Sequence, residues 1–483
     1  MVNKKFRKYQ KSKLKTLFLY KRSQLKFILF TTIIIGFSLF YYIETLALDE
    51  IANKFSFGSS SFFLQIPTTS NNNTTKTLNN SELVFSNVTN ITNNQKDSIY
   101  AQIVAKENYV YIVWEESVTE KPNEKNYDIY FIKSEDNGNT FSKPINLSNN
   151  TGFSEHPQIA VSKKGIFIVW ADNTNSNNTE IMFTKSEDNG TTFSKVINLS
   201  NNSKNSKNQE ISAYDENVYV VWQDTDSTTN LDGNRANEIG GNKLLSSIMF
   251  KASLNNGKTF NDSIELANKT YDAYPKVNSY QEHVYVTWNS ENSKSKSNSK
   301  NNDDDKNSGL FFIKSSDKGN NFENSTKITD YNFGESQIAV NESKVFIVWG
   351  GLDDKNINDI YFVQSDNNGS SFTPPSKFLE KIAQPKNNTN FTDKTNHPTN
   401  VEISYNNPAF IVWQDKVSQE NHDIFITTNI KNNFQATNIV NLSNNTGISE
   451  CPQIAVSKNY VYVVWEDITP GNHEILYTRG IIQ

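Results

Sequence analysis

Acidic side chains recur at two kinds of position in this sequence where they could do chemistry. The first lies two residues after a tryptophan that ends an apolar run, and its members include Asp172, Asp224, Asp415 and Asp467. The second precedes a short apolar segment and includes Glu155 and Glu450. Carboxylates on one surface can hold Ca²⁺, bind a cationic or polyhydroxylated ligand, or act in pairs as the acid and base of a glycoside hydrolase. The competing interpretation is that each acid caps its own turn.

Other catalytic patterns are absent from the sequence. The single cysteine, Cys451, excludes an intramolecular disulfide and any cysteine-cluster metal site. The scattered histidines do not form a zinc motif, and no nucleophile or phosphate-binding motif occurs. No cofactor is therefore required by a motif, and Ca²⁺ is the one that the acidic positions suggest.

Seven copies of one unit position these acids. An apolar run ending in tryptophan recurs at Trp114, Trp170, Trp222, Trp288, Trp349, Trp413 and Trp465, with spacings of 52 to 66 residues. Each unit holds four strand-like segments. Odd and even positions along a segment are both rich in β-branched or aromatic residues, as expected for strands that are buried on both faces. The pattern predicts an all-β, seven-bladed β-propeller with four-stranded blades over residues 81–483. The seven tryptophans are expected in the blade core.

The ends of the repeat array predict how the ring closes. The last repeat stops after Glu474–Gly480 without a fourth strand, whereas Leu83–Thr92 matches the fourth-strand segment Phe141–Ser148 and precedes the first repeat. We expect this N-terminal strand to complete the final blade.

Five similar turns join the third and fourth segments of a unit: Ser134–Phe141, Ser186–Phe193, Ser253–Phe260, Ser315–Phe322 and Ser365–Phe372. We call them box turns, because their pattern, Ser-x-Asp-x-Gly-x-Thr-Phe, resembles the Asp box, or BNR repeat, of the sialidase superfamily. The resemblance implies a propeller, with a six-bladed sialidase-type ring as the alternative to seven blades. It also implies structural roles for Asp136, Asp188, Asn255, Asp317 and Asn367. Each would accept turn amides, while glycine supplies positive φ and the aromatic residue packs the hairpin into its blade.

Sialidase activity is not expected from this sequence. The resemblance implies a substrate carboxylate held by three arginines, a tyrosine nucleophile paired with glutamate, and an aspartate as acid and base. The chain has only four arginines: Arg7, Arg22, Arg235 and Arg479. The first two lie in a basic leader and Arg479 falls within a degenerate box turn, so the clamp cannot be built. Two hypotheses remain: a binding, recognition or cell-surface module, and a divergent, exo-sialidase-like glycoside hydrolase that uses face carboxylates.

The N-terminal sequence predicts where the protein lies relative to a membrane. Residues 1–26 carry ten Lys/Arg and no acid, and residues 27–48 form an apolar span long enough to cross a bilayer. We expect a cytoplasmic segment (1–26), a transmembrane signal anchor (27–48), a flexible Ser/Thr/Asn-rich stalk (49–80) and an extracellular, glycosylated propeller. Secretion after cleavage near Ala47 is the alternative. Expected partners are the membrane and a glycan or surface protein, while the acidic body excludes nucleic acid.

Overall fold

The computed structural model describes residues 83–118, 126–174, 178–225, 246–270, 273–290, 308–330, 335–352, 358–378, 399–405, 409–418, 420–428 and 438–482. All of them belong to one compact unit, Thr74–Gln483. A second unit, Met1–Asn73, lies outside the described residues, as do the expected anchor (27–48) and stalk (49–80). Within the described ranges, no helix is long and apolar enough to span a bilayer.

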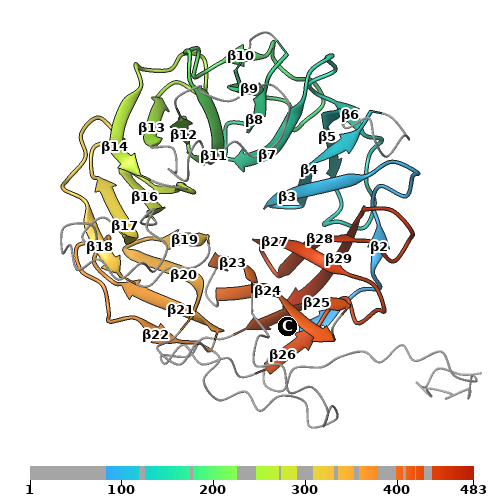
Figure 1. Ribbon diagram of the computed structural model, residues 1–483. Coiled ribbons are helices and arrows are strands. Elements are labelled where there is room, and N and C mark those ends of the chain that lie inside the picture. Colours follow the sequence, from blue (N-terminus) through green and yellow to red (C-terminus); the bar gives the residue numbers. More distant parts are fainter. Residues whose placement is uncertain are drawn as a thin grey trace, which may run out of the picture. The chain divides into compact units, whose positions relative to one another are not determined.

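The described chain forms seven antiparallel sheets arranged as the blades of a ring (Figure 1). Blade 1 contains β3 (Ser98–Lys106), β4 (Tyr109–Ser117), β5 (Tyr127–Ser134) and β6 (Ile145–Asn146). Blade 2 contains β7 (Ser154–Val161), β8 (Ile166–Asp172), β9 (Glu180–Ser186) and β10 (Ile197–Asn198). Blade 3 contains β11 (Asn205–Tyr214), β12 (Asn217–Thr225), β13 (Ser246–Ser253) and β14 (Ile264–Thr270).

The remaining blades repeat this order from the centre outwards. Blade 4 contains β15 (Lys276–Tyr280), β16 (His283–Ser290), β17 (Gly309–Ser315) and β18 (Thr326–Thr329). Blade 5 contains β19 (Ser336–Asn341), β20 (Lys344–Leu352), β21 (Asn358–Ser365) and β22 (Ser376–Lys377). Blade 6 contains β23 (Thr399–Tyr405), β24 (Ala409–Ser418), β25 (Asn421–Thr428) and β26 (Asn438–Asn441). Blade 7 contains β27 (Ser449–Ser457), β28 (Tyr460–Asp467) and β29 (Glu474–Ile482).

Blade 7 is completed by the N-terminal end of the described chain. Strands β1 (Leu83–Phe85) and β2 (Thr89–Asn90) both pair antiparallel with β29. The predicted seven blades and the closure by an N-terminal strand are therefore confirmed, and the six-bladed alternative is wrong.

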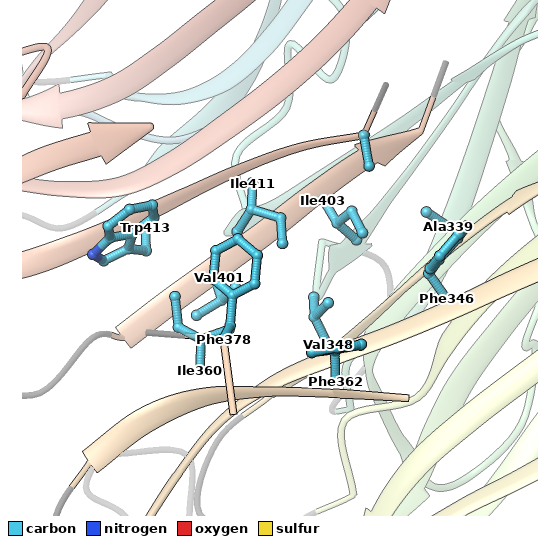
Figure 2. Packing of buried hydrophobic residues seen from close by; sticks show 11 residues of the cluster. Ala339, Phe346, Val348, Ile360, Phe362, Phe378, Val401, Ile403, Ile411 and Trp413 are labelled. Atoms are coloured by element: carbon cyan, nitrogen blue, oxygen red, sulfur yellow. The ribbon is translucent and has the colours of Figure 1, made fainter. Parts of the chain in front are cut away.

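The hydrophobic core consists of layers between neighbouring blades. Seven clusters of buried residues occur in the described chain, one at each junction of two blades. At the junction of blades 5 and 6, Val348 and Phe362 face Ile403 and Ile411 (Figure 2). All seven tryptophans are at most 3% exposed, which confirms their expected place in the core. Because each blade buries both faces, its strands are apolar on both alternation phases.

The box turns connect blades in a way that the sequence did not predict. A Cβ on Gly190, in the box turn of blade 2, would lie 2.5 Å from Cζ of Phe131 in blade 1. Phe193 of the same turn packs edge-on against Phe131, with ring centroids 4.9 Å apart. We call this arrangement the clasp: the glycine and phenylalanine of one box turn hold the third-strand aromatic ring of the preceding blade. The expectation that the box aromatic packs into its own blade is thus corrected.

The clasp recurs around most of the ring. The other described examples are Gly257 and Phe260 on Phe183, Gly319 and Phe322 on Phe250, Gly369 and Phe372 on Phe312, and Gly138 and Phe141 on Tyr477. Blade 7 has no complete box turn, and the residue that would be held by it in blade 6 is Ile426, the partner of Val412 in register. The aromatic ring is therefore replaced by an aliphatic side chain at the junction of blades 6 and 7. The turn of blade 6 lies outside the described residues.

We expect Gly190→Ala to lower the free energy of unfolding by about 2–4 kcal/mol, because the new methyl group meets the Phe131 ring and alanine is strained at a φ of 76°. Chemical denaturation measures the loss. The control is Gly471→Ala, which has a φ of 116° but no atom within 4 Å of the new Cβ, and should cost about 1 kcal/mol. Equal losses in the two variants would show that backbone strain alone matters.

Candidate ligand-binding face

The box turns occupy one face of the ring, and their side chains are bonded within the turn. Asp188 accepts hydrogen bonds from Ser186 Oγ (2.7 Å), Thr192 Oγ1 (2.6 Å) and the Thr192 backbone N–H (2.8 Å). These bonds, led by that from the Thr192 hydroxyl, lower the pKa of Asp188. Equivalent bonds are made by Asp136, Asn255, Asp317 and Asn367. Arg479 lies at this face, where its guanidinium donates to the Asn137 carbonyl oxygen (2.7 Å).

On the opposite face, three of the acids that follow tryptophan join neighbouring blades. Asp172 accepts hydrogen bonds from the indole of Trp170 (3.0 Å), the hydroxyl of Ser154 (2.9 Å) and the amide of Asn150 (2.8 Å). Trp170 and Ser154 belong to the same blade as Asp172, whereas Asn150 follows the outer strand of blade 1. Asp224 and Asp467 make the same three kinds of bond. These carboxylates are bound to the frame of the ring.

Asp415 occupies the corresponding position in blade 6 with different contacts. It pairs with Asp423 in register, and its carboxylate accepts a hydrogen bond from the backbone N–H of Lys416 (2.8 Å). Burial raises the pKa of Asp415 to about 6. In blades 4 and 5 the equivalent residues are Ser290 and Gly351, so the acidic positions do not form a continuous ring.

A bulge at the start of the inner strand distinguishes five blades. The pairing with the second strand shifts there, and one residue adopts a left-handed conformation with φ between 48° and 54°. The five bulge residues are Tyr100, His156, Asn208, Asn400 and Cys451. A left-handed non-glycine residue is costly, and bulges commonly re-aim side chains next to functional sites. These five bulges lie at the start of the inner strands, which surround the centre of the ring (Figure 1).

The residue directly after tryptophan holds the bulge of the next blade. Glu466 of blade 7 accepts a hydrogen bond from the Tyr100 backbone N–H (2.6 Å), and Glu115 of blade 1 accepts one from His156. Gln414 of blade 6 accepts one from Cys451 (3.2 Å). Bulge geometry is thus fixed across three successive blade junctions.

Burial shifts the pKa values of the groups around these bulges. It raises the pKa of Glu466 to about 7 and that of Glu115 well above its usual range. It also raises the pKa of Tyr100 to about 12, assisted by the negative charge of Glu466. The Cys451 thiol has a raised pKa for the same two reasons, burial and the charge of Glu466, so it is a poor nucleophile.

Glu155 and Glu450 immediately precede two bulge residues and are only partly buried. Glu450 lies 3.1 Å from Nδ1 of His422. The Glu155 carboxylate makes no hydrogen bond or ion pair within the described chain. Of the six acids expected at this face, these two combine access with a place beside the bulges. Tyr100 belongs to blade 1, between the blades of Glu450 and Glu155. It is 41% exposed, and its ring centroid is 4.5 Å from that of His156.

A further set of polar residues lies at one register position of every inner strand, opposite the residue that precedes tryptophan. We call it the axial ring: Gln102, Gln158, Glu210, Lys276, Gln337, Glu402 and Gln453. Sequence reasoning missed it, although one long polar side chain stands there in every repeat. No group of three or more His, Cys, Asp or Glu side chains in the described ranges could hold a metal ion, so the geometry gives no support to a Ca²⁺ site.

Comparisons with known proteins place the chain only at the level of the fold. No protein-family model and no curated protein matches it. A protein of unknown function from Dyadobacter fermentans is similar over 82% of this chain and 99% of its own, with 12% identity and a TM-score of 0.46. Trypanosoma rangeli sialidase bound to sialic acid is similar over 83% of this chain and 59% of its own, with 10% identity and a TM-score of 0.44. The chain thus matches little more than half of that sialidase. The fold itself, a seven-bladed β-propeller, follows from the chain's own blades.

We expect the stability of the protein to fall as pH rises from 5 to 8, in part because of Glu466. Its pKa is about 7 when folded and near 4.5 when unfolded, so the folded state holds a proton that the unfolded state has lost. In Glu466→Gln, the loss of unfolding free energy between pH 5 and 8 should be smaller by about 2–3 kcal/mol, measured by denaturation at each pH. Glu135→Gln, at an exposed carboxyl on the box-turn face, should keep the wild-type slope. Identical slopes for wild type and Glu466→Gln would contradict the assignment.

Proposed function

We propose that this protein is a recognition module that binds a polyhydroxylated ligand, such as a glycan, at the centre of its bulge face. The observation that carries the proposal is the set of strained bulges, which presents an exposed aromatic ring, Tyr100, between the accessible carboxylates of Glu155 and Glu450. Aromatic faces pack against sugar C–H groups, and carboxylates accept hydrogen bonds from sugar hydroxyls. On the opposite face, the aspartates and asparagines of the box turns are bonded within those turns.

Binding is favoured over turnover by the roles of the two buried glutamates beside the bulges. Glu115 and Glu466 each accept a backbone N–H of a bulge residue, so both are committed to the scaffold. One observation favours the alternative, a divergent glycoside hydrolase. The pKa of Glu466, about 7, is suited to a general acid. A hydrolase would need a second carboxylate across the ligand from Glu466, and Glu155 is the available candidate.

A glycan array and a panel of fluorogenic glycosides, applied to the purified full-length protein, test both functions. We expect binding of uncharged glycans and no hydrolysis of α-linked sialosides. Glu155→Gln and Glu450→Gln should each weaken binding about three- to tenfold, because the amide keeps an acceptor oxygen but loses the charge that strengthens the hydrogen bond. Glu323→Gln, at an exposed carboxyl next to a box turn, is the matched control. Sialoside turnover would reject the recognition function, and loss of turnover in Glu466→Gln would establish the hydrolase.

We also propose that residues 27–48 anchor the propeller outside the cytoplasm, with residues 1–26 inside and a glycan or surface protein as partner. The apolar span and its basic flank support this arrangement. Mass spectrometry of the mature N-terminus, combined with protease treatment of intact cells, measures it. We expect an uncleaved N-terminus in the membrane fraction and digestion of the propeller from outside. A new N-terminus near Ala47 and protein in the medium would establish secretion instead.

A further inference from the structure

The axial ring is satisfied on one side of the propeller and unsatisfied on the other. Lys276 pairs with Glu210 (2.6 Å) and Glu335 (3.2 Å). The amides of Gln337 and Gln453 donate to the same oxygen of Glu402, at 2.6 and 3.0 Å. Five of the seven ring positions are thus bonded to one another or to a neighbouring inner-strand residue.

At the remaining two positions, the side chains of Gln102 and Gln158 make no hydrogen bond within the described chain. Both side chains are partly exposed, and they occupy neighbouring blades in the same register as the five bonded members. A carboxamide carries two donors and one acceptor, so two free amides provide a directional but uncharged set of partners.

The free amides follow the aromatic pair on the same two inner strands. Gln102 is two residues after Tyr100 on β3, and Gln158 is two residues after His156 on β7. The rings of Tyr100 and His156 are in contact, tilted at 44°. The bulges that turn these rings outwards end at the two glutamines, where regular pairing resumes. The aromatic pair and the two free amides therefore stand on neighbouring inner strands, at the junction of blades 1 and 2.

The charges around this junction are mostly negative. The charge of Glu155 adds to the effect of burial in raising the pKa of Tyr100. Burial lowers the pKa of His156, and the charges of Glu155 and Glu335 oppose that shift. Lys207 is the one cation whose charge contributes to the shift in the pKa of His156, which it lowers. A ligand carrying a carboxylate or sulfate would be repelled here, whereas hydroxyl groups would find both donors and acceptors.

We propose that Gln102, Gln158 and the Tyr100–His156 pair form a subsite for one uncharged sugar residue, with the sugar ring on Tyr100 and its hydroxyls on the two amides. This assignment rests on the proposed glycan-binding function and adds to it the class of sugar and the position of the subsite. Gln337 and Gln453 have the same side chain at the same register, but their amides are engaged by Glu402. Blades 5 and 7 therefore do not contribute an equivalent subsite.

Affinity electrophoresis of the full-length protein tests the subsite. The probes are three neutral polysaccharides, mannan, galactomannan and hydroxyethyl cellulose, and one anionic polysaccharide, polygalacturonate. We expect retardation by at least one neutral probe and none by polygalacturonate. Gln102→Ala and Gln158→Ala should each weaken that binding about three- to tenfold, which corresponds to one lost hydrogen bond. Gln337→Ala is the matched control, and thermal denaturation of each variant verifies that it folds.

The outcomes separate the subsite from the proposed function. Binding that is lost in Glu450→Gln but unchanged in Gln102→Ala and Gln158→Ala would overturn the subsite and leave glycan recognition standing. Stronger retardation by polygalacturonate than by the neutral probes would overturn the assignment of an uncharged sugar. Binding to none of the four probes would reject both proposals. A Gln102→Glu variant that folds and loses binding as completely as Gln102→Ala would further support the need for an uncharged amide.

Discussion

The clasp between a box turn and the preceding blade is the contact that sets the geometry of five of the seven blade junctions. No blade can bury its own two faces, so each junction needs a contact that fixes both the distance and the angle between blades. The glycine allows the turn to approach the aromatic ring, and the phenylalanine covers its edge, as Gly190 and Phe193 do on Phe131. Basic side chains strengthen the same junctions: Lys185 of blade 2 donates to the Asn256 carbonyl oxygen in the box turn of blade 3 (2.8 Å). Ring geometry is therefore specified one junction at a time.

The residues that repeat and the residues that do not repeat have different roles in this molecule. The acids two positions after tryptophan look like ligands when the sequence is read alone. Asp172, Asp224 and Asp467 instead accept hydrogen bonds from a tryptophan indole and a serine of their own blade. Each also accepts one from an asparagine that follows the outer strand of the preceding blade. Tyr100 and His156 have no counterpart in the other repeats, and they stand at the exposed bulges. The repeated residues thus hold the blades together, and the residues that differ between blades are the ones available for a ligand.

The sequence was sufficient to predict the architecture because blade number and closure are one-dimensional patterns. Seven tryptophan runs and a missing last strand can be counted directly. The clasp could not be found in this way, because Phe193 reaches Phe131 only once the angle between blades 1 and 2 is known. The axial ring was hidden for a related reason. A bulge precedes Gln102 and shifts its pairing, so alternation along the strand does not reveal which direction the side chain takes.

The pairing of β1 with β29 has a consequence for the order in which the molecule can form during synthesis. The hydroxyls of Ser86 and Thr478 lie 3.3 Å apart although 392 positions separate them. Closing a loop of that length costs about 5 kcal/mol of chain entropy. The early strand must therefore wait, unpaired, until β29 has left the ribosome. During that interval six blades can assemble while the two end blades of the array present unburied apolar faces to other chains. A nascent chain of this protein would thus be exposed to chaperones until β29 pairs with β1.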